Sequence, residues 1–278
     1  MKASGSLNSV SSVGRRRGFS LVELLVSIGI IGILLALALP SLANARAAAR
    51  ETVALANART LGMSFQAYCD RFGAYPFRSP GTPVDDSGEG PPLPGDLVAV
   101  RWWPRGTIIA TSSVWAFAHL WPGLLSEVAP WPEYFATWVS PGRDKSLPVA
   151  PDPFSDDEPD REPFGTVSWR YSNSFIGAPQ LWREGSVAEE RMLRAIQPHE
   201  VLFPSSKVVA WDADITYVPR EPRIVEDHYD WATPMLFADG HAAVKKPTEA
   251  KETAPNPMNF GSRIKLHNTV NGVRGTDY

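Results

Sequence analysis

The chain has a single cysteine and no excess of positive charge, and each fact limits the class of protein to which it can belong. The 278-residue chain has one cysteine, Cys69, which excludes an intrachain disulfide. Its formal net charge is −3, and because phosphate binding needs a basic surface, this balance argues against nucleic acid as a partner. A Gly-x-Ser-x-Gly nucleophile elbow is also missing, and no spacing gives Cys69 a catalytic partner. We therefore expect a packed core thiol at Cys69, no catalytic residues and no enzymatic activity.

Acidic residues are nearly absent from the N-terminal region, which contains a long apolar run instead. The run extends from Phe19 to Leu39, has a single charge at Glu23, and follows three arginines at 15–17. At about 1.5 Å per residue it would form a helix of roughly 32 Å, long enough to cross the hydrocarbon core of a bilayer. A single segment can satisfy its backbone groups there only as a helix. Arginines before the run predict that this end stays in the cytoplasm.

Glu23 is the exception within the apolar run. A carboxylate at the centre of a membrane span costs roughly 3 kcal/mol or more unless it finds a partner. Because Glu23 lies about one turn into the run, one interpretation is a tolerated boundary charge that reaches the interface. The other interpretation is a pair with a positive group on another copy of the chain. Cleavage after Gly18 would create such a group, the free α-amino group of Phe19.

The residues around this acid resemble a known processing site. Residues 18–25 read Gly-Phe-Ser-Leu-Val-Glu-Leu-Leu, which is similar to the N-terminal motif of type IV prepilins and type II secretion pseudopilins. The resemblance extends over roughly residues 1–60. It implies cleavage between Gly18 and Phe19 by a prepilin peptidase/N-methyltransferase, followed by N-methylation of Phe19. It also implies that Glu23 sets the register between stacked subunits.

An ordinary secretory signal peptide is an alternative for the same segment. Such a peptide has an apolar region of about 7–15 residues, followed by a small-residue cleavage site. The run from 19 to 39 is longer, although the Ala-rich residues 43–49 offer a conceivable cleavage site. The Gly-Phe pair at the border between polar and apolar residues favours the prepilin type.

The apolar run is predicted to continue into a longer helix. Pro40 predicts a kink, but residues 41–70 are rich in Ala, Arg and Leu, which favour helix. Apolar residues recur at spacings of three and four, which predicts a face that docks on a globular domain through Leu61, Phe65, Tyr68 and Phe72. Gly73 and Pro76 then end the helix. The predicted organisation is a leader at 1–18, a helix at 19–75 with a transmembrane part at 19–39, and an exported globular domain at 76–278.

Short strands are predicted for most of the exported domain. We expect strands at 97–103, 107–111, 165–175 and 207–212. A hairpin is expected at 234–245, because Asp239-Gly240 between apolar runs favours a tight turn. Other expected elements are a helical pattern broken by Pro122 at 114–128, a short apolar element at 133–139, a short helix at 187–196, and an extended polar tail from residue 247.

The order of these elements predicts the fold class. One long helix followed mostly by strands favours an α+β fold, with the N-terminal helix packed on a C-terminal antiparallel β-sheet domain, as in type IV pilin-like proteins. All ten tryptophans lie between Trp102 and Trp231. They predict an aromatic core in the exported domain, with a sugar-stacking platform as the alternative.

One group of side chains near the hairpin is a weak candidate for binding a metal ion. Mixed histidine and carboxylate ligands can hold a divalent metal, and the group comprises His228, Asp239 and His241 with Asp212, Asp214, Asp227 and Asp230. The spacing matches no known metal motif, and turns or solvated loops also explain these acids. His228 and Asp239-Gly240 resemble a C-terminal His…Asp-Gly motif of pseudopilin-like proteins, with ten intervening residues here rather than nine.

The acidic, proline-rich loop at 150–163 is a second weak candidate. Carboxylates at Asp156, Asp157 and Glu158 could bind calcium, and the pseudopilin resemblance supports this because some major pseudopilins carry calcium in a C-terminal loop. An Asp-x-Asp-x-Asp-Gly pattern is missing, so a solvated loop is the alternative. Apart from calcium, no cofactor is expected.

Two functional hypotheses follow from the sequence. The first is a pilin-like structural subunit, a pseudopilin, that assembles into a fibre of a type II secretion or type IV pilus-like system. Its partners would be the prepilin peptidase, other pilin-like subunits and the inner membrane. It would cross that membrane once, with a cytoplasmic N-terminus and a periplasmic or extracellular domain. The second is a membrane-tethered ligand- or metal-binding protein that is exported by the prepilin route.

Overall fold

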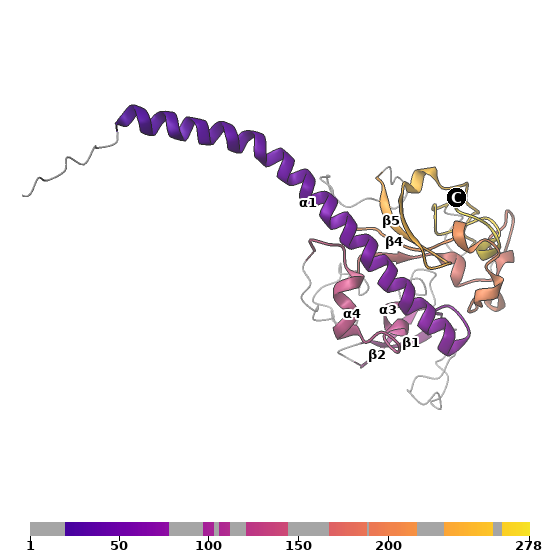
Figure 1. The fold of residues 1–278 in the computed structure, drawn as a ribbon. Coiled ribbons are helices and arrows are strands. Elements are labelled where there is room, and N and C mark those ends of the chain that lie inside the picture. The colour runs from indigo at the N-terminus through magenta and orange to yellow at the C-terminus, as the bar shows by residue number, and fades with distance from the viewer. Residues whose placement is uncertain are drawn as a thin grey trace, which may run out of the picture. The chain divides into compact units, whose positions relative to one another are not determined.

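One long helix, α1, dominates the structure (Figure 1). The computed structural model describes residues 20–77, 97–102, 106–111, 121–143, 167–187, 189–215, 231–257 and 263–278. Helix α1 spans Leu21–Phe72 and continues through Pro40. Contacts divide the chain into two compact units, residues 1–46 and 47–278, and α1 contributes to both.

The part of α1 that belongs to the second unit buries one face. Leu61, Phe65 and Tyr68 are buried at spacings of four and three residues, as the sequence predicts, and Ala58 extends the buried face by one turn. Phe72 differs from the prediction, because its side chain is 43% exposed. The helix ends there because Gly73 adopts a left-handed φ of 74° and its N–H donates to the Cys69 carbonyl over 2.8 Å.

A four-stranded antiparallel sheet lies beside this helix face. Its order is β3 (Trp169–Tyr171), β4 (Val208–Asp212), β5 (Thr233–Phe237) and β6 (Ala242–Lys245). Every residue of β4 and β5 is buried. The main core cluster joins Leu61 and Phe65 of α1 to Tyr171, Val209 and Leu236 of the sheet. The predicted α+β layout, a long helix with an antiparallel sheet, is therefore confirmed.

The remaining described elements are short. Strands β1 (Leu97–Trp102) and β2 (Gly106–Thr111) pair antiparallel in a separate two-stranded sheet, close to the predicted bounds. Helix α4 (Trp131–Trp138) occupies the predicted apolar element at 133–139. Helix α3 (Trp121–Leu125) contains Pro122 in its first turn. The predicted break at Pro122 stays untested, because residues 112–120 before α3 lie outside the described ranges. A proline in the first turn removes no intrahelical hydrogen bond, so α3 accommodates it.

Aromatic side chains fill the core of the second unit. Five tryptophans are almost completely buried: Trp121, Trp138, Trp169, Trp182 and Trp211. Phe65 stacks on Tyr171 with ring centroids 5.5 Å apart, which joins α1 to β3. The core interpretation is confirmed for these five tryptophans, whereas the Trp231 side chain is 45% exposed.

Three local predictions were wrong. The strand expected at 165–175 is limited to β3, and a 3-10 helix at Asn173–Phe175 follows it. The helix expected at 187–196 is a single 3-10 turn at Glu190–Met192 in the part described. The described residues after 247 do not form an extended tail, because the following side chains are buried: Ala250, Ala254, Ile264, Leu266 and Val273. Their apolar residues are too widely spaced to show a period, so only tertiary contacts reveal their burial.

Candidate functional site

The first turn of α1 contains the predicted assembly residue. The Ser20 N–H donates to Glu23 Oε2 over 2.9 Å, and the Glu23 N–H donates to Ser20 Oγ over 3.2 Å. This reciprocal pair is a capping box, which satisfies two backbone donors that a helix start otherwise leaves free. Gly18 and Phe19 lie outside the described residues. The sequence signal for this cap is Ser-x-x-Glu before an apolar run, which the prediction based on the charge of Glu23 missed.

The side chains of residues 20–46 are all exposed. Most of them are apolar, and Leu21 is 74% exposed. By length and composition α1 could cross a membrane. An apolar surface of this size on a single chain requires cover, which a bilayer or the helices of other subunits can supply.

Two of the predicted metal candidates form a satisfied polar cluster at the end of β4. Asp212 Oδ2 accepts from Ser140 Oγ over 2.8 Å, and Asp212 Oδ1 accepts from the N–H groups of Asp214 and Ile215, both over 3.1 Å. Asp214 Oδ2 pairs with Arg143 over 2.5 Å. Burial raises the pKa of Asp212 to about 6, against the lowering effect of its hydrogen bonds.

Asp239 and His241 lie at the opposite end of β4, in the β5–β6 turn. The Ala238 N–H donates to the Lys207 carbonyl, directly before β4. Asp239 Oδ1 accepts from the His241 N–H over 3.1 Å and lies 2.5 Å from His241 Nδ1. Gly240 supplies the left-handed φ of 86° that this tight turn requires. The predicted hairpin is confirmed, and the turn accounts for both side chains.

The metal predictions are therefore only partly covered by the structure. Within the described ranges, no group of three or more His, Cys, Asp or Glu side chains could hold a metal ion. His228, Asp227 and Asp230, and the calcium candidates Asp156, Asp157 and Glu158, lie outside those ranges.

A small cavity is lined by residues of α1 and of the β5–β6 turn. Its volume is about 230 Å³, and its lining includes Arg59, Gln66, Cys69, Tyr75 and Asp239. Small-molecule sites usually measure about 300–1,000 Å³, so this cavity lies just below the usual range. Burial raises the pKa of the Cys69 thiol to about 12, which leaves it protonated and unreactive. The expected packed thiol at Cys69 is confirmed, since the side chain is only 6% exposed.

Comparisons with known proteins give one finding, at the N-terminus. A family model described as the prokaryotic N-terminal methylation motif matches residues 14–39. Neither a curated protein nor a solved structure matches the chain. The chain therefore carries a prepilin-type methylation motif, and the match includes the residues of the predicted processing site and the whole apolar run at 19–39.

Proposed function

We propose that this chain is a pilin-like structural subunit, a pseudopilin, that assembles into a fibre of a type II secretion or type IV pilus-like system. The observation that carries the proposal is the methylation motif at 14–39, on a helix whose described residues 20–46 are all exposed. Such a helix fits two successive environments, the bilayer before assembly and the packed helices of a fibre afterwards.

The proposed sequence of events begins in the inner membrane. The apolar part of α1 holds the chain there, with arginines 15–17 on the cytoplasmic side and the domain in the periplasm or outside the cell. Prepilin peptidase cleaves between Gly18 and Phe19 and methylates the new amino group of Phe19. Processed subunits then leave the bilayer and pack their helices together, while the domains decorate the fibre.

Glu23 has a different partner at each stage of this proposal. Within the single chain its carboxylate accepts the Ser20 N–H, so its charge is partly satisfied at the helix start. During assembly it would accept the Phe19 amino group of a neighbouring subunit. A charge-assisted pair in a low-dielectric helix bundle is stronger than the capping bond it supplements, which would favour one register between subunits.

The test separates the charge of Glu23 from its capping role. Glu23→Gln keeps an oxygen that can accept the Ser20 N–H but removes the charge, whereas Glu23→Ala removes both. We expect both variants to be cleaved and to remain in the membrane, and both to be absent from sheared fibres and cross-linked ladders. Fibres of normal abundance from Glu23→Gln would contradict pairing between subunits.

A membrane-tethered binding protein is the second candidate function. The cavity of about 230 Å³ beside Arg59, Gln66 and Asp239 is the observation that favours it. In the first proposal the domain is not an enzyme, and the catalysts are the peptidase and an assembly ATPase. A purified chain that binds glycan or metal tightly without self-association would support the second candidate over the first.

A further inference from the structure

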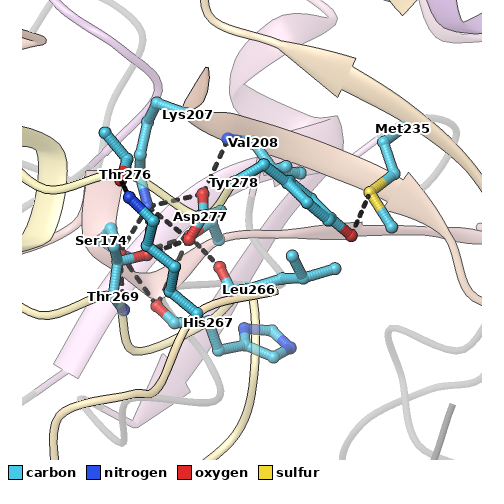
Figure 2. A network of polar contacts seen from close by, with 12 residues as sticks. Ser174, Lys207, Val208, Met235, Leu266, His267, Thr269, Thr276, Asp277 and Tyr278 are labelled. Atoms are coloured by element: carbon cyan, nitrogen blue, oxygen red, sulfur yellow. Dashed lines mark hydrogen bonds and ion pairs between the residues drawn. The ribbon is translucent and has the colours of Figure 1, made fainter. Parts of the chain in front are cut away.

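A fully buried lysine lies at the start of β4. The Lys207 side chain has no exposed surface, and its Nζ lies 3.0 Å from Asp277 Oδ2 (Figure 2). The same Nζ donates to Ser174 Oγ over 3.1 Å and to Thr269 Oγ1. All three ammonium hydrogens therefore have an acceptor, which a buried lysine requires.

The carboxylate of Asp277 also accepts several hydrogen bonds. It accepts from the Val208 N–H over 2.8 Å and from Thr269 Oγ1 over 2.5 Å, in addition to Lys207. Asp277 is itself only 3% exposed. Burial lowers the pKa of Lys207, and the nearby Asp277 charge opposes that effect. Because both side chains are almost completely buried, the ion pair and its hydrogen bonds form one network inside the domain.

Asp277 belongs to a three-residue segment, Thr276–Tyr278, which we call the strap. The Asp277 N–H donates to the Ser206 carbonyl over 2.9 Å, and its own carbonyl accepts from the Lys251 N–H over 2.8 Å. The Tyr278 hydroxyl donates to the Lys246 carbonyl over 2.8 Å. Tyr278 packs against a second apolar cluster, formed by Val208, Trp211, Met235, Phe237, Ala250 and Leu266.

We propose that the Lys207–Asp277 pair is a latch that fixes the register of the strap over this second cluster, and that it contributes specificity rather than net stability. A strap shifted by one residue would leave Lys207 buried with an incomplete set of partners. Breaking a buried pair lowers the folding equilibrium constant about 150- to 5,000-fold, whereas replacing both partners by apolar residues is often neutral. The ion pair thus destabilises shifted registers of the strap more than it stabilises the observed register.

The experiment is a double-mutant cycle on the full-length chain in detergent. Lys207→Met and Asp277→Leu each leave one buried charge unpaired, and we expect each to lower the folding equilibrium constant about 150- to 5,000-fold. The double variant should recover to within about tenfold of the parent. Its strap amides should nevertheless exchange hydrogen faster, at Asp277 and Tyr278, while β4 and β5 keep their protection.

Lys251→Met provides a matched control, because Lys251 also contacts the strap, through Thr276, but is exposed. It should change neither stability nor exchange. A double variant as unstable as the single variants would overturn the specificity claim. Single variants as stable as the parent, or parental exchange rates in the strap of the double variant, would overturn the latch. None of these outcomes depends on the proposed role in fibres, which the Glu23 variants test separately.

Discussion

At the scale of single residues, burial and hydrogen-bond partners together determine the pKa of a carboxyl group. Asp212 illustrates this at the end of β4, where its side chain is almost completely buried and its carboxylate accepts three hydrogen bonds. Desolvation outweighs those bonds, so the pKa of Asp212 rises to about 6. Asp214, whose charge also raises this pKa, is itself paired with Arg143.

Asp212 should make the stability of the chain depend on pH. Its pKa is raised in the folded state from about 3.9 when unfolded, so between pH 4 and 6 the folded state binds the extra proton. Stability should therefore fall as the pH rises through this range, by about 2–3 kcal/mol at most. Asp212→Asn should abolish this contribution, because an amide does not titrate in this range. The amide oxygen can still accept the same N–H groups, so the local structure should persist.

Denaturant unfolding at pH 4.5 and pH 7.5, followed by tryptophan fluorescence, measures this difference. Asp239→Asn is the matched control, because its carboxylate lies in the exposed β5–β6 turn. Equal pH slopes for the parent and Asp212→Asn would show that another group is responsible.

At the scale of elements, the position of α1 on the sheet depends on a close approach at Gly62. A Cβ added there would lie 2.8 Å from Leu236 Cδ1, 3.6 Å from the Gly240 carbonyl oxygen and 3.8 Å from Gly240 Cα. The side chain of Leu236 can move, but the backbone of the β5–β6 turn is fixed by its hydrogen bonds. Glycine at position 62 thus allows α1 to pack directly against this turn.

Gly62→Val should weaken this docking. Its two methyl groups must displace Leu236 and then meet the backbone of Gly240, and overpacking of this kind costs about 1–3 kcal/mol. The expected result is a lower thermal unfolding midpoint of the domain. Gly29→Val is the control, because nothing lies within 4 Å of the position where its Cβ would be. If both substitutions lower the midpoint equally, helix propensity rather than docking explains the loss.

Elements were predictable from the sequence where their causes are local. The β5–β6 hairpin follows from Asp239-Gly240, and the helix end follows from Gly73, because a few neighbouring residues fix the backbone there. The burial of residues after 247 was not predictable, since Asp277 finds its partner Lys207 70 positions earlier in the chain. The same limit applied to the cavity beside Asp239, which α1 and the hairpin form only after they pack.

At the scale of the whole molecule, the two compact units have different chemistry. The unit at 1–46 exposes its apolar side chains in the described part, whereas the unit at 47–278 buries an aromatic core. The methylation motif matches within the first unit only. We therefore assign the proposed roles in export and assembly to the first unit. The second unit would form the outer surface of the proposed fibre.

The proposed processing predicts the composition of the mature chain. Removal of residues 1–18 takes away Lys2 and arginines 15–17 and no acid, so the net charge changes from −3 to −7. N-methylation of the new amino group leaves its charge unchanged and adds one methyl group to the mass. Mass spectrometry of the membrane-extracted protein should therefore find an N-terminus at methylated Phe19, and isoelectric focusing should give a more acidic form than the precursor.

Gly18→Val should block this processing, because a branched side chain at the cleaved bond would hinder the close approach of the peptidase. We expect cleavage to slow by roughly tenfold or more, about 1.4 kcal/mol in the barrier, and the less acidic precursor to accumulate in the membrane. Gly32→Val lies within the same apolar run with open space around it, so it should be processed normally. A mature N-terminus within residues 43–49 in the parent chain would instead identify the segment as a secretory signal peptide, and it would remove Glu23 together with the assembly mechanism that depends on it.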